Sequence, residues 1–117
     1  MTSEGPSRTD SELRVVLCNC PVDGAAALAR ALVEARVAAC VNILAGVTSV
    51  YRWEGRVCED AEKTLLIKTT AGRMAALTAA IRDRHPYDVP EIIALPVQSD
   101  EGEPAYHAWV RDEVHGD

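Results

Sequence analysis

The fold of this 117-residue chain is decided by residues 38–70, AACVNILAGVTSVYRWEGRVCEDAEKTLLIKTT. The first half is dense in Val, Ile, Thr and aromatic residues, and the second half is strongest in KTLLIKTT; both compositions are typical of β-strands. Between the halves, Glu54 and Gly55 make a tight turn in which the glycine supplies a positive φ. The stretch therefore predicts a long β-hairpin, with strands over about 39–52 and 56–70.

The segment before the hairpin predicts one strand and one helix. LRVVLCNC, residues 13–20, is short and rich in apolar residues, and Pro21 ends it because proline offers no N–H to the ladder. Asp23 is the expected N-cap of a helix that runs to about Arg36. The buried face of this helix is expected to consist of apolar residues at i, i+3, i+4 and i+7: Ala25, Leu28, Ala29 and Leu32.

The segment after the hairpin repeats this order. A second helix is expected to run to about Arg84, where Pro86 ends it. Its apolar stripe consists of Met74, Leu77 and Ile81. EIIALPV, residues 91–97, predicts a further strand, and Pro96 marks it as an edge strand or a bulge. A last short helix is expected over about 103–114.

The order β-α-β-β-α-β with a terminal helix is the split βαβ arrangement of ferredoxin-like folds. The predicted fold class is therefore α+β, with an antiparallel sheet, a long central hairpin and a C-terminal helix. Right-handed crossovers place the first two helices on one face of the sheet. A single domain is expected over residues 12–115, because a chain of this length has room for one core. Residues 1–11, rich in Ser, Thr, Gly, Pro and Glu, are expected to form a disordered arm.

The composition argues against two classes of partner. The 12 Lys and Arg residues against 18 Asp and Glu residues give a net charge of −6, and no basic cluster stands out. A nucleic-acid partner is therefore not expected. No apolar run approaches the ~18 residues that a membrane span needs, and the first ten residues lack the pattern of a signal peptide. We expect a cytoplasmic protein without a membrane partner.

The predicted hairpin is longer than the helices that cover it. A strand of about 14 residues spans roughly 45 Å, whereas a helix of about 14 residues spans only about 21 Å. The overhang carries apolar and aromatic side chains beside unpaired backbone groups, and such an edge is a template for another chain. An oligomer is therefore expected, with Tyr51, Trp53 and Trp109 at the subunit interface. The alternative is that the hairpin bends at Gly46 and folds over its own core.

Five motifs carry a resemblance to a known family, and they occur in this order: ACVNI at 39–43, SVYRWEG at 49–55, KT at 68–69, HPYDVPEI at 85–92, and the closing Tyr106…Trp109. Together they resemble the CutA divalent-cation-tolerance family, and the match runs from about Val15 to Val110. The resemblance implies a ferredoxin-like subunit in a tight homotrimer. It also implies a link to tolerance of copper and other divalent metals, with copper binding. No defined catalytic reaction comes with the family, so we expect no enzyme, no catalytic residues and no obligatory cofactor.

The resemblance places the family's suspected copper ligands at Cys18 and His85, and we expect them to form a weak, surface-accessible site for copper or another divalent metal. Thiolate and imidazole are suitable ligands for copper and zinc. Some members carry a second histidine where this chain has Arg84, which cannot ligate a metal. Cys18 and Cys20 share one strand face at ~6.6 Å spacing, so they chelate poorly as a pair. Glu91 is a further candidate ligand. The alternatives are a buried core thiol for Cys18 and a helix C-cap for His85.

The main alternative function is a regulatory module like the nitrogen-regulatory PII proteins, which binds a small anionic ligand or a partner protein at subunit clefts. The residues that would line such a cleft are Lys63, Lys68, Arg82 and Arg84. The alternative is a solvated face on which these residues form ion pairs with Glu59, Asp60 and Glu62. A third alternative is a scaffold role for the assembly itself.

Other polar residues suggest no catalytic arrangement. His107 and His115 lie two helical turns apart, too far to share a metal, and are expected to be exposed. His85, Tyr87 and Asp88 are expected to form a network at a subunit interface. Cys40 and Cys58 are expected to be small, partly buried thiols.

Overall fold

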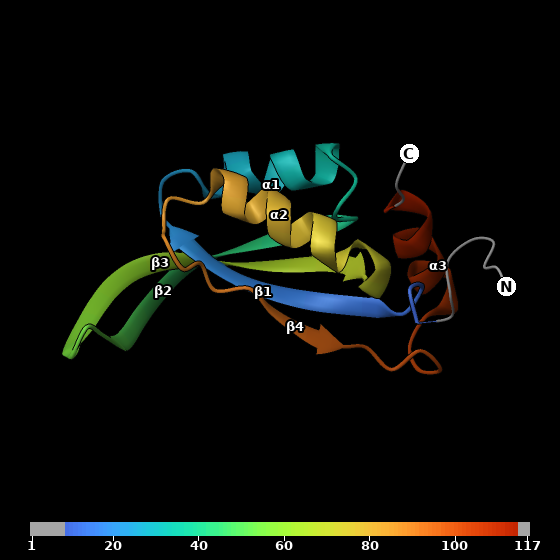
Figure 1. Cartoon of the computed structure of the whole chain (residues 1–117). Coiled ribbons are helices and arrows are strands. Elements are labelled where there is room, and N and C mark those ends of the chain that lie inside the picture. The colour runs from blue at the N-terminus through green and yellow to red at the C-terminus, as the bar shows by residue number, and fades with distance from the viewer. Residues whose placement is uncertain (1–8, 115–117) are drawn as a thin grey trace, which may run out of the picture.

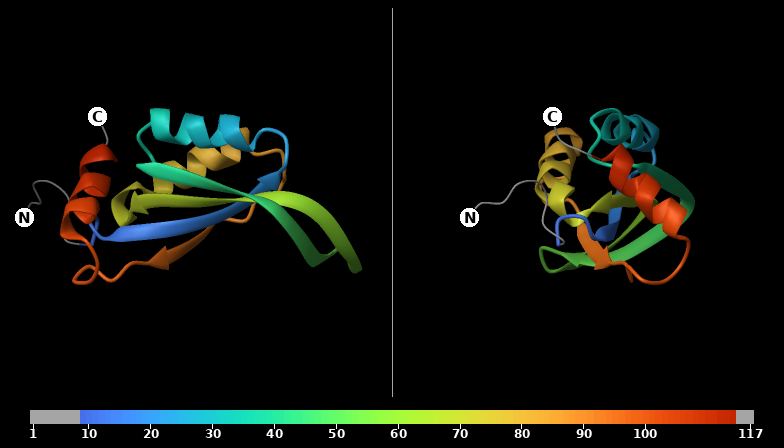
Figure 2. Two further views of the ribbon diagram at one scale, coloured as in Figure 1. Left: turned by 180° about the vertical axis from the view of Figure 1, so that it is seen from behind. Right: turned by 90° about the vertical axis from the view of Figure 1, so that its right-hand side faces the viewer.

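The chain folds into one antiparallel sheet with two helices packed on one of its faces (Figures 1 and 2). The computed structural model describes residues 9–114. Its elements are β1 (Leu13–Pro21), α1 (Ala25–Glu34), β2 (Cys40–Trp53), β3 (Arg56–Thr70), the 3-10 helix η1 (Ala71–Arg73), α2 (Met74–Arg84), β4 (Ile93–Pro96) and α3 (Pro104–Glu113). The strand order is β2-β3-β1-β4, and all pairings are antiparallel. The predicted α+β fold is confirmed.

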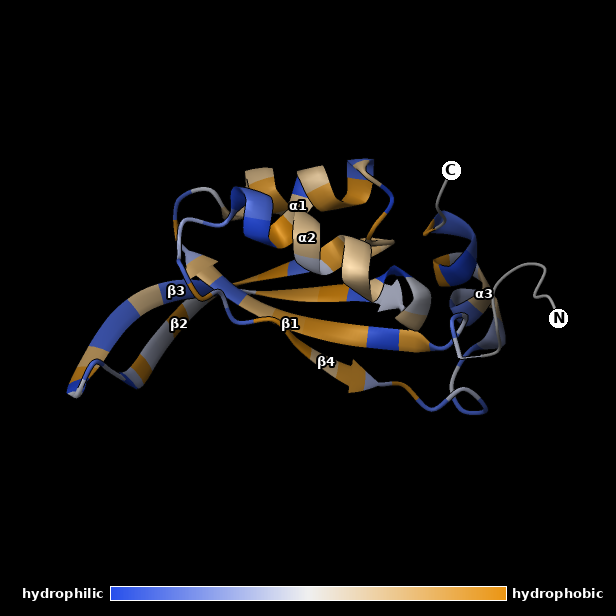
Figure 3. Ribbon diagram, in the orientation of Figure 1, coloured by the Kyte–Doolittle hydropathy of each residue, from blue (hydrophilic) through white to orange (hydrophobic). Residues whose placement is uncertain are grey.

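The core lies between the sheet and the helices α1 and α2. Alternate residues of β1 and β3 are buried, as expected for strands with one covered face. In Figure 3 the hydrophobic colour dominates β1 and β3 beneath the helices, whereas hydrophilic segments interrupt the projecting hairpin. The predicted stripe of α1 is buried, and in α2 Leu77 and Ile81 are buried while Met74 packs at the margin. The largest fully buried side chains of this core are Val16, Leu32, Leu65, Ile67, Leu77 and Ile81.

The second face of the sheet is open at its centre. Leu17 lies on this face, because its neighbours Val16 and Cys18 point to the helices. Its partners across β3 and β4 are Leu66 and Ile93, so three apolar side chains form a row. Neither α1 nor α2 covers the row (Figure 2). At one end of the sheet, α3 packs Val110 and Val114 in a small cluster with Leu13 and Ala39.

The hairpin of β2 and β3 projects beyond the helices (Figure 1). Its tip is a two-residue turn in which Glu54 and Gly55 have φ of 50° and 79°, as a type I′ turn requires. A register shift between Leu44 and Val47 surrounds Gly46, whose φ is 78°. A bulge therefore lies at the glycine where the alternative placed a bend. The hairpin nevertheless does not fold over its own core, because its distal side chains are largely exposed.

Several element ends differ from the expectation. Helix α1 has Gly24 as its N-cap, without a side-chain cap, so the predicted cap by Asp23 was wrong. Glycine fits because its φ there is 94°. The helix stops at Glu34, and Arg36 adopts a positive φ of 59° after it. In α3, Glu103 caps the helix by accepting from the Ala105 N–H at 3.0 Å.

The chain before β1 packs against η1. The Gly72 N–H donates to the Asp10 carbonyl at 2.9 Å, and a side chain at position 72 would meet Asp10 at 3.0 Å. Residues 9–11 of the predicted arm therefore lie against the domain, and residues 1–8 lie outside the described part. Within residues 9–114, no helix has the length and apolar content of a membrane span.

Candidate functional site

Cys18 lies in β1 with its side chain under the helices. The residue is completely buried, and its Sγ is 3.9 Å from the Asn19 carbonyl oxygen. Burial, with smaller contributions from Cys20, Glu91 and Glu62, raises the pKa of the Cys18 thiol to about 12. The thiol is therefore protonated at neutral pH, whereas a metal binds the thiolate.

His85 follows α2 directly and is 7% exposed. Its backbone N–H donates to the Ile81 carbonyl at 2.8 Å, so the residue is the C-cap of the helix. Nδ1 accepts from the Tyr87 N–H at 3.2 Å, and Nε2 lies 2.9 Å from the Asn19 carbonyl oxygen. These bonds fit a neutral ring with its proton on Nε2, and both nitrogens are engaged by backbone groups.

The two predicted metal ligands meet at one atom of β1, because Cys18 Sγ and His85 Nε2 both contact the Asn19 carbonyl oxygen. Each residue is buried, so the expectation of a surface-accessible site was wrong, and metal binding by either requires a local rearrangement. Burial also raises the pKa of Cys20, with a smaller contribution from Glu62. Among residues 9–114, no three His, Cys, Asp or Glu side chains are grouped to hold a metal ion. All four cysteines are free, and Cys40 and Cys58 are half-buried, as expected.

A cavity of about 580 Å³ lies between the hairpin and the segment 85–92, and we call it the hairpin pocket. Tyr51 and Trp53 of β2 and Glu62 of β3 line one side of it. The other side is formed by the segment after α2 and by β1. Its lining residues there include Asn19, Tyr87, Asp88 and Glu91.

Hydrogen bonds tie the walls of this pocket together. The Tyr87 hydroxyl donates to Glu62 Oε2 at 2.7 Å, and the Tyr51 hydroxyl donates to Asp60. The Tyr87 ring packs on His85 with centroids 4.7 Å apart. A continuous path therefore runs from β3 through Tyr87 and His85 to the backbone of β1. Burial is the main cause of the raised pKa of Tyr87, and the hydrogen bond to Glu62 is the second. The hydrogen bond to Asp60 raises the pKa of Tyr51 to about 12.

The pocket is acidic. Glu62 is 6% exposed and has no ion pair within residues 9–114. Burial and the nearby charge of Glu62 raise the pKa of Glu91. Asp88 adds a third carboxyl group to the lining, which contains no Lys or Arg.

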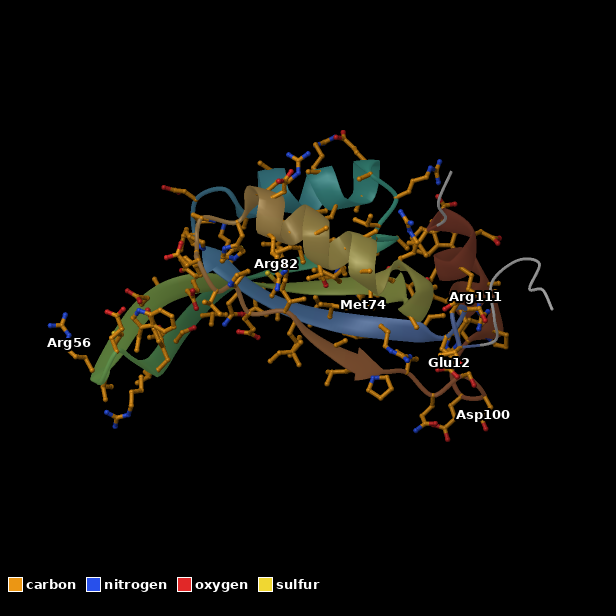
Figure 4. All side chains as sticks on the ribbon, in the orientation of Figure 1. Glu12, Arg56, Met74, Arg82, Asp100 and Arg111 are labelled. Atoms are coloured by element: carbon orange, nitrogen blue, oxygen red, sulfur yellow. The ribbon has the colours of Figure 1, made fainter. Side chains whose placement is uncertain are left out.

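The four basic residues considered for an anion cleft do not line the hairpin pocket. Lys63 and Lys68 are five positions apart on β3 and so point to opposite faces of the sheet. The Lys68 ammonium group bonds to Asn42 Oδ1. Arg82 extends from α2, far from Arg56 at the hairpin tip (Figure 4), and lines a separate cavity of about 370 Å³. Arg84 is exposed.

The aromatic residues predicted at a subunit interface are largely accessible in the isolated subunit. Tyr51, Trp53 and Trp109 are 42%, 50% and 42% exposed. The Trp109 ring packs on Tyr106 with centroids 5.5 Å apart. His107 is buried, so the expectation that it is exposed was wrong. His115 lies outside the described residues.

Glu62 is the site residue that the sequence did not reveal. Its neighbours in β3 gave only a strand pattern, and its burial depends on Tyr87, which is 25 residues away in the chain. Tyr87 and Asp88 were noted beside His85 in the sequence. The structure joins Tyr87 to both His85 and Glu62. The position of Tyr87 beside His85 was therefore the sequence feature that pointed toward this site.

Comparison with known proteins identifies the family. The family model described as CutA1 divalent ion tolerance protein matches residues 14–113. The chain belongs to this family. The divalent-cation tolerance protein CutA of Thermus thermophilus is 50% identical over 99 residues, which cover 84% of this chain and 94% of that protein. The CutA homolog of Xenopus laevis is 42% identical over 114 residues, covering 97% of this chain and 74% of that protein.

Solved CutA structures agree with the observed fold. The divalent cation tolerance protein (Cut A1) from Thermus thermophilus aligns with a TM-score of 0.84 and 47% identity, over 88% of this chain and 99% of that one. The structure titled PII-like protein CutA from Nostoc sp. PCC 7120 aligns with a TM-score of 0.83 and 35% identity, over 87% of this chain and 97% of that one. This chain therefore resembles CutA proteins in both sequence and architecture.

Proposed function

We propose that this CutA chain acts as a cytoplasmic homotrimer that supports tolerance of divalent metals, copper above all, by binding them weakly and without catalysis. The open sheet face and the projecting hairpin carry the proposal. The 14 and 15 residues of β2 and β3 span roughly 45–50 Å. The 10 and 11 residues of α1 and α2 span only about 15–17 Å. The helices are therefore too short to cover the whole hairpin, and its distal part is largely exposed.

The uncovered surfaces favour association of identical copies. The row of Leu17, Leu66 and Ile93 is apolar, and the edge strands β2 and β4 each leave one side of the backbone unpaired in the sheet. Val50 and Val57 of the hairpin are 63% and 65% exposed. A closed symmetric ring buries such surfaces on every copy. Four free cysteines support a reducing compartment such as the cytoplasm.

Light scattering tests the assembly. We expect the mass of three subunits at micromolar protein concentration. A stable single subunit with an ordered hairpin would contradict the proposal.

The proposed metal site uses Cys18 and His85, with Glu91 as a third candidate. Because both residues are buried and Cys18 is protonated, we expect weak binding that releases a proton. Cu(I) and Cu(II) are titrated under controlled redox conditions into the wild type, Cys18→Ser and His85→Ala. We expect both substitutions to weaken binding. Equal affinities across the three proteins would end the assignment.

A second candidate function is a PII-like regulatory role with a ligand or partner protein at subunit clefts. The observation that favours it is the hairpin pocket, whose volume of about 580 Å³ lies within the range of small-molecule sites. A thermal-shift screen with nucleotides and small anions tests an anionic ligand. A specific upward shift supports this candidate, and no shift with any anion counts against an anionic ligand.

A further inference from the structure

The walls of the hairpin pocket combine aromatic rings with carboxyl groups. Tyr51, Trp53 and Tyr87 supply the rings, while Glu62 and Glu91 supply two of the carboxyl groups. Aromatic faces attract cations through their quadrupole, and carboxylates attract them through charge. Among the described residues, no Lys or Arg lines the pocket to neutralise the charge of these carboxyl groups.

Glu62 is the most buried carboxyl group of the pocket. It is 6% exposed, and no cation pairs with it within residues 9–114. The Tyr87 hydroxyl satisfies Oε2 and fixes the orientation of the carboxyl group. Oε1 has no hydrogen-bond donor among the described residues, but it is not one of their buried unsatisfied atoms and remains accessible to solvent. A cation in the pocket can therefore reach this oxygen and form a charge-assisted contact with it.

Glu91 lines the same cavity and is half-buried. Two carboxylates that share one cavity repel each other, and a cation between them is attracted by both.

The size of the pocket and its chemistry favour an organic cation over a bare metal ion. A cavity of about 580 Å³ is far larger than a single ion. The described residues also offer no group of three ligands for a metal. Rings and carboxylates together match an ammonium or guanidinium group attached to an apolar body.

We infer that the hairpin pocket binds a small organic cation of the amine or guanidine class, held by Glu62 and Glu91 and covered by Tyr51, Trp53 and Tyr87. The inference rests on the second candidate function, a ligand site beside the hairpin, and assigns the ligand a positive charge instead of a negative one. Tyr87 is a positioning residue because it holds Glu62 toward the cavity.

Calorimetric titration of the full chain with three probes of similar shape tests the charge. The probes are benzylammonium, neutral benzyl alcohol and benzoate. We expect saturable binding of benzylammonium at one site per subunit, and at least about tenfold weaker binding of the other two. Equal binding of the alcohol, or no binding of benzylammonium at millimolar concentration, would overturn the inference.

Substitutions then place the site. Glu62→Gln and Glu91→Gln should each weaken benzylammonium binding about tenfold or more. Glu59→Gln is the matched control, because Glu59 is an exposed residue of β3 outside the pocket lining. Glu91 is less buried than Glu62. We therefore expect Glu91→Gln to fold even if Glu62→Gln does not, so that one variant still tests the site. Binding unaffected by Glu91→Gln, or weakened as much by Glu59→Gln, would refute the placement.

Light scattering on the same samples separates this inference from the proposed assembly. Trimers that fail to bind benzylammonium overturn the ligand assignment alone. Single subunits overturn the assembly, whether or not they bind the probe.

Discussion

At the scale of residues, the link between Tyr87 and Glu62 connects the site to stability. Tyr87→Phe removes the hydroxyl donor and leaves a buried carboxylate oxygen without its hydrogen bond. We expect the free energy of unfolding in urea to fall by about 1–2 kcal/mol. Tyr51→Phe is the control, because its bond to Asp60 is exposed to solvent; its effect should be clearly smaller. Equal losses in the two variants would contradict the role assigned to Glu62.

Cys18 gives a prediction for alkaline pH. Its pKa is raised from 9.0 to about 12 in the folded chain, so the folded state keeps a proton that the unfolded state loses. The contribution of this thiol to the free energy of unfolding is fully present below about pH 9. It is lost as pH rises toward 12, by up to about 1.4 kcal/mol per pH unit. Denaturant unfolding between pH 8 and pH 10.5 measures this slope.

Cys18→Ala should make the decline of the unfolding free energy with rising pH shallower, whatever the substitution does to stability at pH 8. Cys58→Ala is the matched control, because Cys58 lies on the projecting hairpin and is only half-buried. A slope that stays the same in Cys18→Ala would show that this thiol does not hold its proton in the folded state.

The candidate site was only partly predictable from single residues. Cys18 and His85 were found by motif position, but a motif does not report that the thiol is fully buried or that both ring nitrogens bond to backbone. His107 was expected to be exposed, since polar residues on a terminal helix usually are, yet it is buried. Burial of a polar side chain depends on residues distant in sequence, which one strand or helix pattern cannot show.

At the scale of elements, the turn of the hairpin depends on two positive φ angles. Gly55→Ala places a Cβ at φ 79° with no atom within 4 Å, so its cost is purely conformational. We expect a loss of about 1 kcal/mol. Glu54→Gly should cost nothing or stabilise the chain, because glycine adopts φ 50° without strain. Thermal unfolding at fixed protein concentration compares them, and an unchanged midpoint in Gly55→Ala would contradict this account.

Strands and helices were predictable because periodicity depends on neighbours along the chain. The turn at Glu54 and Gly55 and the edge position of β4 followed from glycine and proline chemistry. Helix ends were less accurate. Asp23 was the expected cap, but the left-handed backbone at Gly24 displaced it, and no local pattern distinguishes these two starts.

At the scale of the whole molecule, the open sheet face predicts how assembly is disrupted. Ile93→Glu introduces a charge into the apolar row of that face, at a residue 49% exposed in the subunit. We expect folded single subunits by light scattering and circular dichroism. Val33→Glu is the matched control, because Val33 is 40% exposed on α1, away from that face; it should leave the trimer intact. A trimer that survives Ile93→Glu would contradict burial of this face.

The projecting hairpin has a practical consequence, because its two strands are paired only with each other beyond the bulge. In a separated subunit its amide protons would exchange with solvent quickly, while those of β1 beneath the helices would exchange slowly. Deuterium uptake by residues 46–57 over a dilution series would therefore serve as an internal gauge of subunit separation. One peptide could thus report the dissociation constant of the assembly without any attached label.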